Sequence, residues 1–218
     1  TCALPISDEN VLTFKEAPDY ETKDSYSITL TLTDGTETVT KDVTIAITNV
    51  NDVAPSFTSD ATFSAAENQT AIGTVTATDA EGDAVTFIIS GDELAITSAG
   101  VLTFVSAPDY ETKATFTATV TATDGVNISQ QNVTVNVTNL NDNTPVITSS
   151  ATYSAEENQT AIGTVTATDA DGDDVTFTVS GSELTITQSG TLTFVTAPDF
   201  ETKTTYTATV TASDGTKI

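Results

Sequence analysis

The sequence predicts an all-β chain made of tandem, seven-stranded antiparallel β-sandwiches. Three observations support this fold class. Threonine alternates with apolar residues over long stretches, as in residues 115–123, which is the period of a half-buried strand. No stretch shows the period of an amphipathic helix. Turn residues such as Asp124-Gly125 separate the alternating stretches at short intervals, as they do in sandwiches.

The chain is also repetitive, with a period of 90 residues. The sequence Pro-Asp-Tyr-Glu-Thr-Lys at residues 18–23 recurs at 108–113 and, with Phe for Tyr, at 198–203. Solenoid repeats are only about 20–50 residues long, so this period indicates small independent domains. We expect three repeats. They are a partial repeat at 1–55 that holds the C-terminal part of a domain, a complete repeat at 56–145, and a repeat at 146–218 that lacks its C-terminal strand.

In the middle repeat the expected strands follow one another closely. They lie at residues 61–65, 72–78, 85–89, 94–96, 101–105, 115–123 and 133–137. The second strand places Val75 and Ala77 on one face and threonines on the other. We expect Phe87, Phe104 and Phe116 to face inward from later strands. With the aliphatic residues they give a modest core, of the size that a domain this small can bury.

The composition is strongly acidic. The 218 residues include 31 Asp and Glu and 6 Lys, without Arg or His, for a net charge of -25. This charge excludes nucleic acid and anionic membranes as partners, because both bind basic surfaces. No apolar run approaches the roughly 20 residues of a membrane helix, so we expect no membrane insertion in this segment. We expect a longer parent protein, because the chain starts without Met; the only cysteine, Cys2, has no disulfide partner.

Two polar segments that end in proline, residues 49–55 and 139–145, join the repeats. Alternate loops of a sandwich gather at opposite ends, so acids from two successive repeats should meet at each joint. Seven carboxylates would converge at the second joint: Glu67, Asp109, Glu111, Asp142, Asp169, Asp171 and Asp214. Each pair at 4 Å repels by about 1 kcal/mol even in water, so cations are needed to offset the cost. Oxygen donors without His favour Ca²⁺ over zinc or copper.

The order of these acidic motifs resembles that of cadherin repeats. Glu67-Asn68 is similar to that family's acidic motif after the first strand, and residues 79–81 and 169–171 resemble its Asp-x-Asp. Residues 109–111 resemble its Asp-Arg-Glu, residues 141–145 resemble its linker Asn-Asp-Asn-x-Pro, and Asp124 resembles its lone acid before a turn. The resemblance covers the whole chain. It is to tandem cadherin-like domains of large bacterial surface proteins, which are immunoglobulin-like Greek-key sandwiches joined end to end.

The resemblance implies about three Ca²⁺ at each complete joint, and their charge would nearly neutralise the seven acids. At the second joint it adds Asn141 and the backbone carbonyls of Leu140 and Asn143 as ligands. At the first joint the matching set is Asp19, Glu21, Asn51, Asp52, Asp79, Glu81 and Asp124. Glu157, Asp199 and Glu201 would serve a third joint, of which the sequence contains one half.

Several residues depart from the family pattern. Tyr20, Tyr110 and Phe200 stand in place of the Arg of Asp-Arg-Glu, which removes a charge partner but no ligand. Val53 replaces the second Asn of the linker motif, without loss if only its carbonyl binds. Glu81 replaces Asp and is one methylene longer, so weaker binding is expected at the first joint.

The resemblance implies a calcium-rigidified extracellular module for cell adhesion, in a parent protein anchored to a membrane or envelope. Its partners would be Ca²⁺ and cell-surface proteins or glycans, with homophilic contacts among the options. A second hypothesis is a non-adhesive spacer or a carbohydrate-binding module of a large secreted enzyme. A glycosidase pair at Asp109 and Glu111, or at Asp169 and Asp171, is disfavoured because the set repeats and the sequence lacks His and Trp. We therefore do not expect an enzyme.

Overall fold

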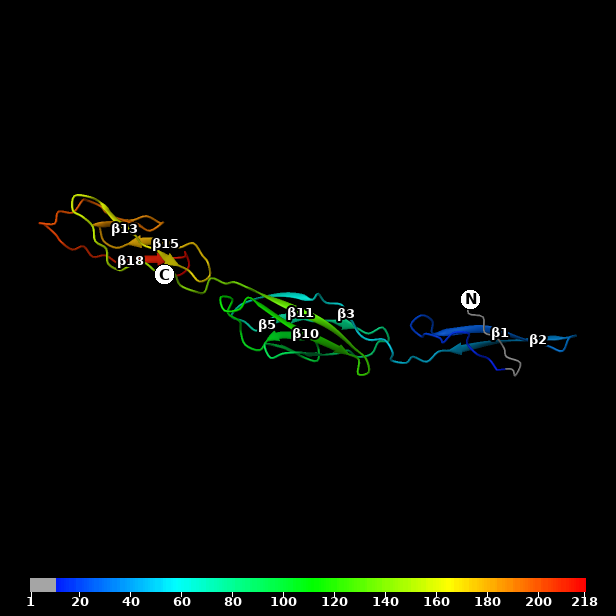
Figure 1. Ribbon diagram of the computed structural model, residues 1–218. Coiled ribbons are helices and arrows are strands. Elements are labelled where there is room, and N and C mark those ends of the chain that lie inside the picture. The colour runs from blue at the N-terminus through cyan, green and yellow to red at the C-terminus, as the bar shows by residue number, and fades with distance from the viewer. Residues whose placement is uncertain (1–10) are drawn as a thin grey trace. The chain divides into compact units, whose positions relative to one another are not determined.

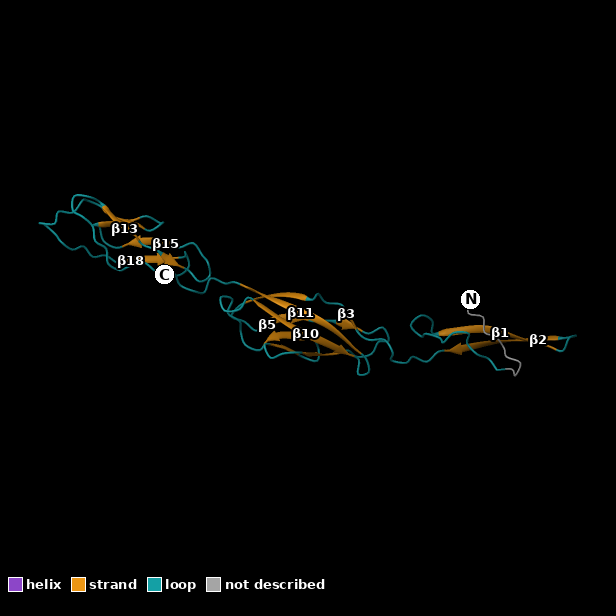
Figure 2. Cartoon of the chain, in the orientation of Figure 1, coloured by secondary structure: helices purple, strands orange, loops and turns teal. Residues whose placement is uncertain are grey.

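The computed structural model describes residues 11–218, so Cys2 lies outside the described part of the chain. Every regular element between residues 11 and 218 is a β-strand, as Figure 2 shows, and this part contains no apolar helix that could cross a membrane. The chain divides into two compact units. The first comprises Thr1–Phe63, Thr70–Ser106 and Phe116–Val135, and the second comprises Ser64–Gln69, Ala107–Thr115 and Asn136–Ile218. The repeat boundaries expected from the sequence stay a prediction.

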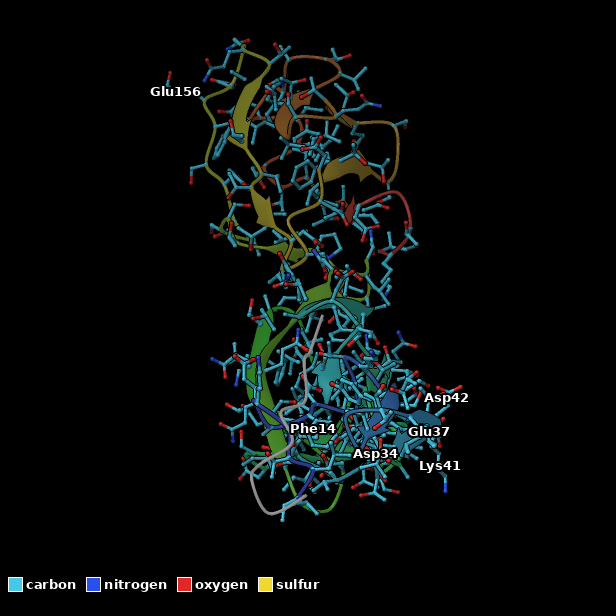
Figure 3. All side chains as sticks on the ribbon, turned by 90° about the vertical axis from the view of Figure 1, so that its right-hand side faces the viewer. Phe14, Asp34, Glu37, Lys41, Asp42 and Glu156 are labelled. Atoms are coloured by element: carbon cyan, nitrogen blue, oxygen red, sulfur yellow. The ribbon has the colours of Figure 1, made fainter. Side chains whose placement is uncertain are left out.

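The first repeat contributes one long hairpin (Figure 1). In it β1 (Ser25–Thr33) pairs antiparallel with β2 (Thr38–Ala46) over nine residue pairs. The turn is held by Asp34, whose Oδ1 accepts the N–H groups of Thr36 and Glu37 at 2.9 and 2.7 Å. Figure 3 labels Asp34 and Glu37 on this hairpin. Leu32 and Val39 are 75% and 67% exposed, and no further sheet within residues 11–55 covers them.

The middle repeat contains nine short strands. They are β3 (Ser56–Phe57), β4 (Thr62–Ala66), β5 (Ala71–Thr74), β6 (Ala77–Thr78), β7 (Thr86–Ile89), β8 (Leu94–Ile96), β9 (Val101–Phe104), β10 (Thr115–Thr123) and β11 (Ile128–Thr138). One sheet has the order β4-β11-β10-β7 and another has the order β5-β9-β8, with a short β3-β6 ladder. The predicted all-β sandwich is therefore confirmed. Each predicted strand has a counterpart, but the one at 72–78 is divided into β5 and β6, and β3 was not predicted.

The core of this repeat consists of the residues that alternate inward. Phe87, Phe104 and Phe116 are 7%, 2% and 9% exposed, as the alternation predicts. Phe104 and Phe116 pack edge to face, with ring centroids 5.0 Å apart. Val75 is fully buried, while its neighbours Thr74 and Thr76 are exposed. Every second residue of these strands therefore faces the core, as the alternating sequence predicts.

The predicted strand at 72–78 differs from the structure because it is interrupted. β5 ends at Thr74, and the Val75 N–H donates to the carbonyl of Gly100 at 2.8 Å. The carbonyl of Thr76 then accepts the N–H of Thr58 at 2.8 Å, and β6 pairs with β3. The chain thus changes partner at Val75, from β9 to β3.

The described strands of the third repeat correspond in order to β3 and β5–β10 of the middle repeat, and residues 152–156 form no counterpart of β4. Its strands are β12 (Val146–Ile147), β13 (Ala161–Thr164), β14 (Ala167–Thr168), β15 (Thr176–Val179), β16 (Leu184–Ile186), β17 (Thr191–Phe194) and β18 (Val210–Ser213). They form the sheets β12-β14, β13-β17-β16 and β15-β18. The core is Val165, Phe177, Leu192 and Ala212, each 90 residues after a buried residue of the middle repeat.

Gly100 provides a stability test of this architecture. It has a φ of +87°, and a Cβ added to it would lie 2.1 Å from the carbonyl oxygen of Val75. Gly91 has a similar φ of +83° but open space around it. Both Gly→Ala changes incur the left-handed backbone penalty of about 1–2 kcal/mol. We expect Gly100→Ala to lower the free energy of unfolding by at least about 2 kcal/mol more than Gly91→Ala, because only the former must displace backbone. Equal losses in urea denaturation would contradict this packing.

Candidate metal centre

Glu67, which follows β4 directly, is the buried centre of the second joint. It is only 2% exposed. Its Oε2 accepts the N–H of Tyr110 at 2.8 Å, and its Oε1 accepts the N–H of Leu140 at 2.7 Å. These two charge-assisted bonds offset part of the cost of burying a carboxylate. One side chain thereby fixes both the 109–111 motif and the linker.

Four predicted acids meet at this joint. Ligand oxygens of Glu67, Glu111, Asp142 and Asp171 lie within 4.8 Å of one another. The side-chain amide of Asn143 bridges three of them, because its Nδ2 donates to Glu111 at 3.2 Å, Asp142 at 2.9 Å and Asp171 at 3.0 Å. The sequence predicted only a carbonyl ligand from Asn143, so this bridging role was missed.

Asp171 holds the linker from the other side. Its Oδ2 accepts the N–H groups of Asp142 and Asn143 at 3.1 and 2.8 Å. Asp169 in turn positions Asp171, since the Asp171 N–H donates to Asp169 Oδ1 at 3.0 Å. Asp169, Asp171 and Asp173 also bring their carboxylates within 4.8 Å of one another. Asp173 was not predicted; its Oδ2 accepts the Nδ2 group of Asn141 at 2.7 Å.

The first joint is a simpler version of the same arrangement. Glu21, Asp52 and Glu81 form one group within 4.8 Å, and Asp79, Glu81 and Asp83 form another. Glu81 accepts the linker N–H groups of Asp52 and Val53 at 3.0 and 3.2 Å, one on each carboxylate oxygen. The carboxylate of Glu81 therefore contacts the linker although its side chain is one methylene longer than that of Asp.

The two joints differ at the linker position occupied by Val53 and Asn143. The side chain of Val53 has no amide that could bridge carboxylates. The first joint therefore lacks the three contacts that the side chain of Asn143 makes at the second. The first joint instead uses Asn127, whose Nδ2 donates to Asn51 Oδ1 at 2.5 Å. Asn127 was not predicted, and Lys217 occupies the equivalent position of the third repeat.

Four predicted acids lie outside the compact groups. Asp19 and Asp109 accept hydrogen bonds from the hydroxyl groups of Thr22 and Thr112, at 2.8 and 3.0 Å. Asp124 and Asp214 each use Oδ1 to accept two N–H groups of their own turns. The grouping therefore brings together five of the seven predicted acids at the second joint and four of six at the first.

The local charges shift the pKa values of these acids in opposite directions. Loss of hydration raises the pKa of Glu111, and the negative charges of Glu67 and Asp171 raise it further. The side-chain amide of Asn143 lowers the pKa of Asp171, and the linker N–H groups lower it further, against a loss of hydration. The backbone N–H of Lys217 holds the pKa of Asp214 below its usual value of 3.8. Hydrogen bonds thus favour the ionised forms of Asp171 and Asp214, whereas loss of hydration and neighbouring charge disfavour that of Glu111 despite its hydrogen bond from Asn143.

Several oxygens at the joints have no donor. Asp79 Oδ2, Asn141 Oδ1, Asp169 Oδ2 and Asp214 Oδ2 are buried atoms without a hydrogen-bond partner. Buried polar atoms are normally paired, so each of these oxygens is free to accept a hydrogen bond or to ligate a cation. Carboxylate and amide oxygens are the ligands of hard cations, of which Ca²⁺ takes six to eight. The residues at both joints therefore fit Ca²⁺.

Comparisons with known proteins agree with this fold. The family model described as a bacterial Ig domain matches residues 141–217. Protocadherin Fat 1 of Homo sapiens is 30% identical over 198 residues, which cover 79% of this chain and 4% of that protein. Cadherin EGF LAG seven-pass G-type receptor 1 of Mus musculus is 30% identical over 194 residues, covering 79% of this chain and 6% of that protein. The chain thus spans less than a tenth of the length of these relatives.

Solved cadherin structures have the same fold. The crystal structure of mouse cadherin-23 EC22-24 superposes with a TM-score of 0.74 at 21% identity, covering 97% of this chain and 77% of that one. The protocadherin gammaB7 EC3-6 structure gives a TM-score of 0.75 at 22% identity, covering 91% of this chain and 58% of that one. Cadherin and immunoglobulin-like adhesion domains are non-enzymatic folds. With its repeated β-sandwiches and these relatives, the chain belongs to the cadherin-like repeat family.

Proposed function

We propose that this chain is a calcium-binding, calcium-rigidified segment of an extracellular adhesion protein. The observation that carries the proposal is the set of buried, donor-free oxygens at Asp79, Asn141, Asp169 and Asp214, which lie in the motifs of the two acidic joints. The cadherin names of the relatives support the adhesive, cell-surface role. Ca²⁺ and cell-surface proteins or glycans, including further copies of the protein, would be the partners.

The ligands of the two joints divide as follows. Asp19, Glu21, Asn51, Asp52, Asp79, Glu81 and Asp124 would hold Ca²⁺ at the first joint. Glu67, Asp109, Glu111, Asn141, Asp142, Asn143, Asp169, Asp171 and Asp214 would hold it at the second. The proposed domains are residues 1–55, 56–145 and 146–218, and about three ions would occupy each complete joint. Bound Ca²⁺ would supply the positive charge that neutralises the carboxylates.

Hydrogen bonds at the second joint position the linker without a bound cation. Glu67 and Asp171 hold the linker N–H groups of Leu140, Asp142 and Asn143, so the linker carbonyls and side chains are already oriented. Repulsion among the acids remains: loss of hydration raises the pKa of Glu111, and the charges of Glu67 and Asp171 raise it further. Neutralising that repulsion would stiffen the linker, because the opposing carboxylates would then be held together rather than apart.

The test combines small-angle scattering with thermal melting of the chain. The protein is first stripped with chelator and then titrated with Ca²⁺ up to a few millimolar, because extracellular modules bind at about 10⁻⁴–10⁻³ M. We expect the melting temperature to rise by several degrees and the maximum dimension to increase, since stiff joints extend the chain. If neither quantity changes while Ca²⁺ is added, the proposal is wrong. A matched addition of NaCl at equal ionic strength controls for screening.

A further inference from the structure

The side-chain amide of Asn127 lies among four oxygen atoms of the first joint. Asn127 is the last residue of the turn between β10 and β11. Its Nδ2 lies 2.5 Å from Asn51 Oδ1, 3.4 Å from the Asn51 carbonyl oxygen, 3.5 Å from the Val53 carbonyl oxygen and 3.4 Å from Asp124 Oδ2. An amide nitrogen carries two hydrogens, so two donors are shared among four acceptors. Several oxygens thus converge on this nitrogen, as they would on a cation.

These oxygens belong to groups of the proposed Ca²⁺ site. The side chains of Asn51 and Asp124 are proposed ligands, and the carbonyl of Val53 corresponds to that of Asn143 in the second linker. The oxygens also fix the orientation of the Asn127 amide, because the reversed amide would place its own oxygen against a carboxylate and two carbonyls. Asn127 therefore covers these oxygens with N–H donors.

The equivalent oxygens of the second joint are uncovered. Residues 141, 214 and 217 lie 90 positions after residues 51, 124 and 127. Asn141 Oδ1 and Asp214 Oδ2 are buried and accept no hydrogen bond, so the side chain of Lys217 does not cover them. The carboxylate of Asp173 holds the Asn141 amide in this orientation, since its Oδ2 accepts the Nδ2 group at 2.7 Å. The two joints thus present the same oxygens in opposite states.

The turn that carries the differing side chain is the same in both joints. Asp124 Oδ1 accepts the backbone N–H of Asn127 at 2.7 Å, and Asp214 Oδ1 accepts that of Lys217 at 2.6 Å. These bonds involve the backbone alone, so a substitution at residue 127 or 217 leaves them possible. The side chain can therefore be exchanged without removing the bond that closes the turn.

We propose that Asn127 determines the Ca²⁺ affinity of the first joint, because its amide must leave the oxygens of Asn51, Val53 and Asp124 before an ion can bind them. Displacing the amide costs its hydrogen bonds, which lowers the affinity. The inference concerns the regulation of the proposed calcium site and rests on the proposed function. The residue at this turn position would set the Ca²⁺ concentration at which a joint fills. If Asn127 instead organised the ligands for the ion, removing its amide would weaken binding, which is the opposite sign.

The test is a Ca²⁺ titration of the isotope-labelled chain by NMR, starting in chelator. The backbone amides of Asp52 and Val53 report on the first joint, and those of Asp142 and Asn143 report on the second. We expect Asn127→Ala to strengthen Ca²⁺ binding at the first joint at least about fivefold and to leave the second joint unchanged. Both residues are neutral, so the substitution does not alter the charge of the joint.

The reverse substitution, Lys217→Asn, introduces the amide at the second joint. It also removes a positive charge, which by itself would strengthen the binding of a cation. We expect Ca²⁺ binding at the second joint to weaken at least about fivefold, against the effect of charge. The matched control Lys217→Ala removes the same charge without adding an amide, and it should bind Ca²⁺ at least as tightly as the unchanged chain.

The side-chain amide protons of Asn127 give a readout without a cation. In chelator they should exchange slowly with solvent, and added Ca²⁺ should shift their resonances as the first joint fills. The inference is overturned if these protons are unprotected in chelator, if Asn127→Ala does not strengthen the first joint, or if Lys217→Asn does not weaken the second. In each of these cases the calcium proposal stands as long as Ca²⁺ shifts the linker amides. If Ca²⁺ shifts no linker amide in any variant, both proposals are wrong.

Discussion

In chelator, Glu67→Ala should accelerate hydrogen exchange at the Tyr110 and Leu140 amides by roughly 30-fold or more. Each of these N–H groups loses its bond to the buried Glu67 carboxylate, and a hydrogen bond to a charged group contributes about 1.5–3 kcal/mol. A loss of about 2 kcal/mol corresponds to the stated factor. The joint would thus loosen even without a metal ion, because the same carboxylate ties the linker to the 109–111 motif.

The matched control is Glu157→Ala in the third repeat. Glu157 is exposed and accepts a single N–H, that of Phe200. Its loss should accelerate exchange at Phe200 by at most about fivefold, because water replaces the acceptor. Similar effects of the two substitutions would show that burial of Glu67 does not organise the second joint.

The second large effect is expected from Asp169→Asn. The amide oxygen can still accept the N–H of Asp171, but an amide nitrogen takes the place of the donor-free Oδ2. The site loses one charge and gains a donor where a cation would bind. Changes to outer partners of metal sites already cost about 10–100-fold in affinity, so we expect a loss of about 100-fold or more at the second joint. Calorimetric titration with Ca²⁺ measures it directly.

Two controls separate this effect from a general change in charge. Asp79→Asn is the equivalent change at the first joint, where Asp79 Oδ2 is also donor-free, and should remove binding there alone. Asp174→Asn removes one charge from an exposed neighbour outside the predicted set and should leave both joints intact. If Asp174→Asn weakened Ca²⁺ binding as much as Asp169→Asn, diffuse charge and not ligation would govern the affinity.

The fold could be predicted where the pattern is long and local. Nine alternating residues define β10, and Val133, Val135 and Val137 define the inward face of β11. β3 has only two residues, too few to carry a period. The interruption after Thr74 depends on Gly100, which lies far along the chain and supplies the acceptor for Val75. Such partner changes are set by tertiary contacts that a local pattern does not contain.

The candidate site could be predicted in the same uneven way. The 90-residue repetition and the family motifs identified the acids. In the structure most of these acids lie in compact groups of carboxylates. Asn68, which donates to Asp142, and Asn127, which donates to Asn51, have partners 74 and 76 residues away. Asn68 lies in the Glu67-Asn68 motif, but nothing in the local sequence identifies the distant partner of either amide. Asp83 and Asp173 did carry a signal, because each extends the acidic motif by the same two-residue step, which places a third carboxylate in one turn.

The near identity of neighbouring repeats has a kinetic consequence. The strands that β11 pairs with in its own repeat, β4 and β10, have sequences almost the same as residues 151–155 and 206–212 of the next repeat. Only the four-residue turn 124–127 connects β11 to β10, and short loops of this kind close within about 0.1 μs. Pairing with the more distant repeat needs a slower and entropically costlier closure. The short turn therefore favours pairing within one repeat over strand exchange between similar repeats.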